Sequence, residues 1–548
     1  MGSTAARLLL APAVAALWAG PALAGNEPNI DTIGANPCAI TSGTTSVTCS
    51  VTTIDQSVVV NVNNGQDYNN SSDATSITAT ISGSGSFTTA DYYNAFYFAS
   101  WGQQPNNSYN FAGYTNGGDV TVNTSADATL TIGTTSNLNY SLQSSNNDQN
   151  VYWGQGGGAL VALSIGGNGN SENANETDDY DAGDGGAVSI TNTGSLTVSF
   201  SNYVNGQVQP NIPMTANAIA AISLGGNGAD GKQNDTDYAG VGGAGGAVTV
   251  TNQGALSVSS TADIPTVGIL AVSQGGVGSN RKGYASAPGG DGGKVLVTHE
   301  SALTVNAPFA VGIVAVSAGG DSDFDTGDDG GEASGAGNGG SSTVTLTSGA
   351  SVTFASSGST GIGVIAASAG GNANNNAVGQ GGTATVNINA GATIDTSGAG
   401  GDLSIGAMAV SAGSVGSLFS ETANYNYNAD YPGSAGDATV NNDGTVNTQG
   451  TLAVGVAALS IGGAALVTSS DSGDATLGND GAQQGALGGS TATVNNTGAI
   501  TTLGSSAYGI LAASIGGGGG LMDLETSDQN ATLGSATDGG GTGDGSAV

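Results

Sequence analysis

Serines in a recurring context are the first residues whose spacing suggests a chemical role. Eight of them follow an alanine by two positions and precede a glycine by two: Ser164, Ser223, Ser273, Ser317, Ser368, Ser411, Ser460 and Ser514. The pattern approaches the Gly-x-Ser-x-Gly nucleophile turn, but alanine replaces its first glycine. A single histidine cannot serve eight nucleophiles as a base. His299 follows Thr298 as Asn252 follows Thr251, so we expect it to be a polar turn residue.

A group of acidic residues matches the ligand spacing of a calcium loop. Asp321, Asp323, Asp325, Asp329 and Glu332 take positions 1, 3, 5, 9 and 12 of one segment, as in an EF-hand. Position 6 is threonine instead of glycine, and no flanking helices are predicted. The segment is a candidate Ca²⁺ site, with a solvated acidic loop as the alternative. We expect no other cofactor.

The two cysteines, Cys38 and Cys49, lie close together near the N-terminus. In an exported protein such a pair more often forms a disulfide than a metal or redox site. We therefore predict a Cys38–Cys49 disulfide, with two free thiols as the alternative.

The charge balance excludes several classes of partner. The 548 residues include 41 acidic residues against 5 Lys plus Arg, a formal net charge of −36. Nucleic acids and anionic membranes are bound through basic surfaces, so neither is an expected partner. Glycine accounts for 97 residues and aromatic residues for 5%. Such a chain cannot fill a broad core, but it can fill a narrow, repeating one.

The N-terminus has the three parts of a secretory signal. Arg7 is the positive region, residues 8–19 are a short apolar segment, and Ala22-Leu-Ala24 is a small-x-small cleavage site. We expect residues 1–24 to be removed between Ala24 and Gly25. Residues 25–85 lack the serine phrase and are interpreted as an N-terminal β cap.

From residue 86 onward the serine phrase repeats. If a degenerate copy at Ser100 is included, successive serines of the phrase are 43 to 64 residues apart. The full copies follow the pattern Gly-Ile-x-Ala-x-Ser-x-Gly-Gly, as in residues 509–517. The units also have two short alternating strands joined by a turn, and this turn is Asn-x-Gly at residues 192–194, 252–254, 389–391, 442–444 and 496–498. This period and three strands per unit predict an all-β, elongated β-helix of about nine repeats, with Gly- and Asp-rich loops on one face.

Two structural expectations follow from the repeat. Asparagines at the same turn of successive units can bond amide to amide along the axis. The strand that contains the serine is apolar at both alternating sets of positions, so we expect burial on both of its faces.

The leader, the Gly-Gly-x-Gly-Gly loops, the Val-x-Val-x-Asn-x-Gly strand and turn, and the serine phrase together resemble the passenger regions of autotransporters, the type V secreted surface proteins of Gram-negative bacteria. The resemblance covers about residues 86–548. It implies a right-handed β-helix, a C-terminal outer-membrane β-barrel as export partner, and a location at the cell surface or outside the cell. Adhesion or surface structure is the expected role, without catalysis and with an unknown host or cell-surface ligand.

The alternative function is a polysaccharide-degrading enzyme, because β-helices also carry lyases and hydrolases. A hydrolase needs two fixed carboxylates, and the acids here lie in Gly-rich loops. Lyases of this fold use Arg or Lys as base, and Arg281 and Lys282 share one loop.

The last six residues, 543–548, repeat the start of a unit at residues 183–188 with one difference. We therefore expect the chain to be cut off within a repeat, and to stay periplasmic if no barrel is supplied. The alternative is a complete secreted protein whose last rung frays.

Overall fold

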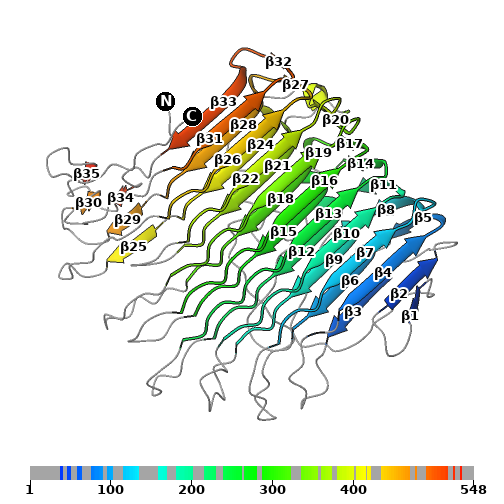
Figure 1. Cartoon of the computed structure of the whole chain (residues 1–548), viewed down its shortest axis with the longest axis horizontal. Coiled ribbons are helices and arrows are strands. Elements are labelled where there is room, and N and C mark those ends of the chain that lie inside the picture. Colours follow the sequence, from blue (N-terminus) through cyan, green and yellow to red (C-terminus); the bar gives the residue numbers. More distant parts are fainter. Residues whose placement is uncertain are drawn as a thin grey trace, which may run out of the picture.

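The computed structural model describes residues 74, 76–89, 95–102, 115–134, 158–169, 181–200, 215–229, 239–261, 265–279, 287–322, 335–355, 360–372, 379–399, 403–414, 433–463 and 489–515, together with isolated strands at 38–40, 46–50, 58–63, 416–420, 465–469, 475–477, 522–524 and 531–533. These residues form a right-handed β-helix of about nine rungs, which confirms the predicted fold class (Figure 1). Its only described helical segment is the 3₁₀ turn η1 (Ser397–Ala399).

Three sheets make up the solenoid, and each takes one strand from each rung. Sheet A contains β1 (Cys38–Ile40), β2 (Ser46–Ser50), β4 (Ile77–Ser82), β7 (Val120–Thr124), β10 (Val188–Asn192), β13 (Val248–Asn252), β16 (Val295–His299), β19 (Ser342–Leu346), β22 (Ala384–Ile388), β26 (Ala438–Asn442) and β31 (Ala492–Asn496).

Sheet C follows sheet A in every rung and contains β5 (Ser84–Thr89), β8 (Thr129–Thr134), β11 (Ser195–Phe200), β14 (Leu256–Ser260), β17 (Ala302–Asn306), β20 (Ser351–Phe354), β23 (Thr393–Asp395), β27 (Thr445–Gln449) and β32 (Ala499–Leu503).

Sheet B holds the serine phrase and contains β3 (Val58–Asn63), β6 (Phe96–Trp101), β9 (Gly158–Ile165), β12 (Ala216–Leu224), β15 (Pro265–Gln274), β18 (Phe309–Ala318), β21 (Thr360–Ala369), β24 (Leu403–Ala412), β28 (Leu452–Ile461) and β33 (Tyr508–Ile515). Two further small sheets consist of β25 (Gly416–Ser420), β29 (Ala465–Ser469) and β34 (Met522–Leu524), and of β30 (Ala475–Leu477) and β35 (Ala531–Leu533).

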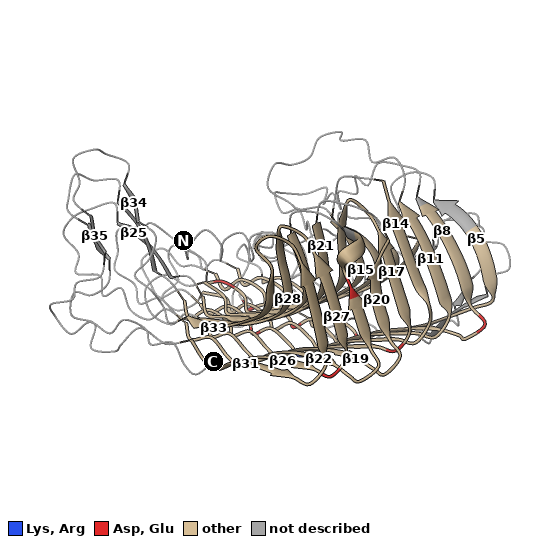
Figure 2. Ribbon diagram, turned by 90° about the horizontal axis from the view of Figure 1, so that it is seen from above, with Lys and Arg blue, Asp and Glu red and all other residues tan. Residues whose placement is uncertain are grey.

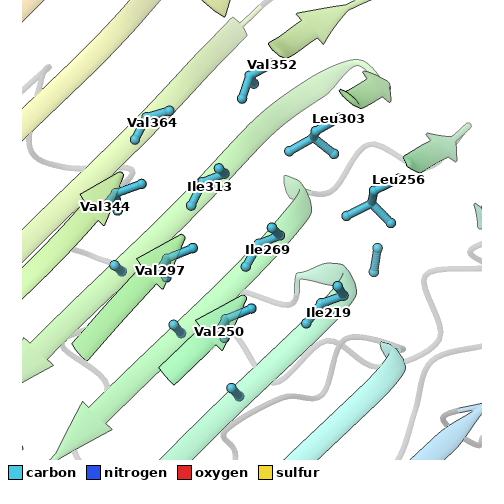
Figure 3. Close-up of a cluster of buried hydrophobic side chains, with 14 of the residues drawn as sticks. Ile219, Val250, Leu256, Ile269, Val297, Leu303, Ile313, Val344, Val352 and Val364 are labelled. Carbon is cyan, nitrogen blue, oxygen red and sulfur yellow. The ribbon is translucent and has the colours of Figure 1, made fainter. Parts of the chain in front are cut away.

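Small and β-branched residues fill the interior because three strands meet in a narrow cross-section. Val250 of β13, Leu256 of β14 and Ile269 of β15 form one layer, and the same layer recurs in the next rungs (Figure 3). All three side chains are at most 2% exposed. Burial of each side chain stabilises the fold by about 1.5–3 kcal/mol relative to exposure. Because the layer recurs in successive rungs, the core is a stack of contacts between neighbouring rungs.

The strands of sheet B from β9 to β28 are buried on both faces, as predicted. All nine residues of β12 are buried. Ala221 belongs to the interior cluster, whereas Ile222 belongs to a second cluster on the outer side. Alternate residues of a strand point to opposite faces, which explains why both sets are apolar.

Glycines close the corner where each rung leaves sheet B. The backbone N–H of Gly226 donates to Gly183 O (2.9 Å), that of Gly243 to Gly226 O (2.9 Å), and that of Gly276 to Gly243 O (2.8 Å). Segments that leave and re-enter the solenoid therefore alternate along the axis. A Cβ atom on Gly276 would lie 1.7 Å from Gly226 O, so only glycine fits this seam.

The first described strands close one end of sheet A. β1 pairs with β2 in the antiparallel sense, whereas β2 pairs with β4 in parallel. At the opposite end of the described solenoid, Leu503, Tyr508, Ile510 and Ile515 of β32 and β33 are 42–57% exposed. The described residues include no helix with the length and apolar character of a membrane span.

Candidate functional site

The repeated serines form a structural hydrogen-bond relay inside the solenoid. The Ser317 hydroxyl donates to Gly293 O (2.7 Å) and accepts from Gly340 N–H (2.8 Å), and its residue is fully buried. The same pair of bonds, one donated to a backbone carbonyl and one accepted from a backbone N–H, recurs at Ser164, Ser223, Ser273, Ser368, Ser411 and Ser460. Ser273, for example, donates to Gly246 O (2.8 Å) and accepts from Gly293 N–H (2.8 Å). These hydroxyls are consumed by the backbone, so they are not available as nucleophiles.

Ser100 belongs to the same relay and confirms the ninth copy of the phrase. Ser100 pairs in register with Ser164, and its hydroxyl accepts from Gly118 N–H at 3.0 Å.

His299 lies in a ladder of turn residues between sheets A and C, as predicted. Asn192 Nδ2 donates to Asn252 Oδ1 (2.7 Å), and Asn252 Nδ2 lies 3.1 Å from His299 Nδ1. His299 Nε2 lies 3.1 Å from Ser351 O, so Nε2 carries the proton and Nδ1 accepts. Burial lowers the pKa of His299, against weaker raising effects of the backbone of Ser351 and Ser301 and of Glu300. The imidazole is therefore a neutral structural rung and not a catalytic base.

The ladder is interrupted where the turn changes length. Leu346 and Ile388 take the ladder position in the next two rungs. The first paired residue of sheet C comes five positions after each of them, but only three positions after Asn192. The expected ladder member Asn389 follows Ile388 and is out of register with Asn442. Its turn contains Gly391 at φ 85°, a left-handed conformation that glycine allows. The ladder resumes at Asn442, whose Nδ2 donates to Asn496 Oδ1 (2.7 Å).

The cysteine pair is placed opposite by the backbone register. Residue 38 of β1 is the direct antiparallel partner of residue 49 of β2. Directly opposed residues have Cα atoms about 4.5–5.5 Å apart, within the range that a disulfide spans. The Cys38–Cys49 disulfide remains a prediction, now with a compatible backbone register.

The first residue of the candidate calcium loop has a structural partner. The Asp321 carboxylate accepts from the backbone N–H of Asn372 at 2.6 Å, and burial raises its pKa while that bond opposes the shift. Asp323, Asp325, Asp329 and Glu332 lie outside the described residues, as do Arg281, Lys282, Ala24 and Gly25. Within the described ranges no three His, Cys, Asp or Glu residues gather as a metal site. Calcium binding stays a prediction.

The outer side of sheet A is an ordered polar surface, which we call the Thr–Asn face. It consists of two columns of outward-pointing residues that run in register across nine strands, from β4 to β31. The first column is Thr78, Thr121, Ser189, Thr249, Leu296, Thr343, Thr385, Thr439 and Thr493, and the second is Thr80, Asn123, Thr191, Thr251, Thr298, Thr345, Asn387, Asn441 and Asn495.

Side-chain hydrogen bonds order part of this face. Asn495 Nδ2 donates to Asn441 Oδ1 (2.8 Å), Asn441 Nδ2 to Asn387 Oδ1 (2.8 Å), and Asn387 Nδ2 to Thr345 Oγ1 (3.2 Å). The residues of both columns are half-buried or exposed. Neither column contains a charge, although the whole chain carries −36.

Sequence reasoning did not identify this face. Its signal was present as threonine or asparagine at alternate positions of Val-Thr-Val-Thr and Ala-Thr-Val-Asn strands. The acidic residues of the described framework are few and lie mostly at turns (Figure 2).

Comparison with protein-family models, with curated proteins and with solved structures found no match for this chain.

Proposed function

We propose that this chain is an exported surface solenoid of the autotransporter-passenger kind, with an adhesive or structural role and no catalysis. The observation that carries the proposal is the serine relay, because it assigns the most repeated hydroxyl groups of the chain to rung-to-rung bonding. The outer faces and loops are then the surfaces left for contact with other molecules.

Three features support export. Residues 1–24 have the composition of a secretory leader. The cysteines stand opposite each other in an antiparallel pair, which suits an oxidising compartment. The solenoid gains its stability from contacts between neighbouring rungs, so it can fold progressively as it emerges from a membrane.

Surface display tests the proposal. Residues 1–548 are fused ahead of an outer-membrane β-barrel translocator in a Gram-negative host, with a variant lacking residues 1–24 as control. We expect a mature N-terminus at Gly25 and cleavage by protease added to intact cells, and we expect neither for the control. Retention of the uncleaved chain inside the cell would refute export.

A polysaccharide screen tests the second half of the proposal. The purified mature chain is incubated with a panel of neutral and acidic polysaccharides, and new reducing ends or unsaturated products are measured. We expect binding without turnover. Sustained release of products would replace the adhesive or structural role with the lyase or hydrolase alternative.

A further inference from the structure

The Thr–Asn face is a two-dimensional lattice of hydrogen-bonding groups. Neighbouring strands lie about 4.8 Å apart, and alternate residues of one strand about 6.6 Å apart. The register shows no slip from β4 to β31. The strands keep nearly the same direction along the solenoid (Figure 1), so the lattice does not fan out as it would in a strongly twisted sheet.

The groups of the lattice are largely fixed in position. Threonine is β-branched, which restricts its χ1 rotamers on a sheet. The asparagines 387, 441 and 495 are held by the amide ladder. A rigid surface loses little conformational entropy when it binds a rigid partner.

The composition of the two columns excludes the commonest partners. They contain no charged residue for a phosphate, a carboxylate or a metal ion, and no Trp, Tyr or Arg of the kind that dominates protein interfaces. The face is the outer side of a flat sheet and not a concave site for a small molecule. The partner it fits is an extended, uncharged, repeating surface of hydrogen-bonding groups.

Ordered water has this chemistry and nearly this spacing. Hydrogen-bonded oxygens lie about 2.75 Å apart, so second neighbours in a tetrahedral water lattice are about 4.5 Å apart and the perpendicular repeat is about 7.3 Å. The spacings of the protein lattice differ from those of the water lattice by about 0.3 Å from strand to strand and by about 0.7 Å along the strand. If β16 is aligned with a row of the water lattice, β4 and β31, four strands away on either side, are displaced from their rows by about 1.2 Å, which is less than half of the repeat of about 4.5 Å in this lattice.

We propose that the Thr–Asn face adsorbs to ice. Threonine hydroxyls and asparagine amides take the place of lattice waters, and the threonine methyl groups cover the contact from bulk water. Leu296, the one apolar member of the columns, lies in β16 between Thr249 and Thr343. It interrupts the array in the middle.

Ice partition of the full mature chain tests this inference. Protein is mixed into water that freezes slowly on a cold finger, and the amount in the ice is compared with that of serum albumin. We expect enrichment in ice and a freezing point below the melting point. The double variant Thr249→Tyr/Thr343→Tyr adds two bulky rings beside β16, and we expect its partition into ice to fall on the order of tenfold, equivalent to about 1.4 kcal/mol.

Two further variants make the test specific. Thr304→Tyr places the same ring on the outer side of sheet C, where Thr304 is half-buried, and should leave ice partition unchanged. Leu296→Thr completes the first column without added bulk and should raise it. Exclusion of the wild-type chain from ice, an equal loss with Thr304→Tyr, or no gain with Leu296→Thr would each overturn the proposal.

Sedimentation distinguishes binding to ice from the alternative that a second copy of the chain covers this face. Two copies stacked through their Thr–Asn faces would sediment as a dimer that the Thr249→Tyr/Thr343→Tyr variant dissociates. That result without enrichment in ice would assign the face to self-association instead. Failure of surface display would leave the ice result unaffected, because partition is measured on purified protein.

Discussion

Replacement of Ser317 by alanine probes the relay that joins the rungs. The hydroxyl makes two bonds in the middle of the solenoid, to Gly293 O (2.7 Å) and from Gly340 N–H (2.8 Å). Ser317→Ala removes both and creates almost no cavity. Each orphaned backbone group costs about 1–3 kcal/mol. Both glycines are only partly buried, so some water reaches them, and we expect a loss of about 2–3 kcal/mol.

Urea unfolding of the mature chain, followed by circular dichroism, measures this loss. Solenoids can unfold in segments, so hydrogen exchange of the Gly340 amide provides a local second measurement. Thr304→Ala is the matched control, since Thr304 lies on the outer face of the same rung and should change stability by less than about 0.5 kcal/mol. An equal, small effect of both substitutions would refute the structural role of the serines.

Three further predictions follow from the same architecture. Burial holds the pKa of His299 below 6.5, so the unfolded chain takes up the proton first as the pH falls. The free energy of unfolding should therefore be highest above about pH 6.5 and decrease below it. His299→Asn, which restores the ladder amide, should remove this part of the pH dependence of urea unfolding. Gly320→Ala should disrupt its rung, because the new Cβ would lie 1.9 Å from a neighbouring carbonyl, whereas Gly509→Ala meets nothing within 4 Å and serves as the control in the same thermal unfolding assay. Mass spectrometry of the unreduced, alkylated protein should find a Cys38–Cys49 disulfide worth about 3 kcal/mol, and two alkylated thiols would contradict it.

The sequence by itself was sufficient for the repeating architecture. The eight-fold Ala-x-Ser-x-Gly phrase, the alternating strands and the Asn-x-Gly turns predicted a β-helix because each rung must match the next one at every position. The same logic identified His299 as a ladder residue, since it replaces Asn252 one unit later. It failed at Asn389, because a turn that is two residues longer shifts the asparagine out of register.

Only the tertiary structure decided which groups meet along the axis. The relay joins Ser317 to glycines 24 residues before and 23 residues after it, and the glycine seam alternates between segments that leave and re-enter the solenoid. Repeat spacing does not reveal these partners because loops of unequal length separate them. The Thr–Asn face has the same origin. Alternating threonines occur in single strands of the sequence, but a flat lattice exists only once parallel pairing aligns nine strands side by side.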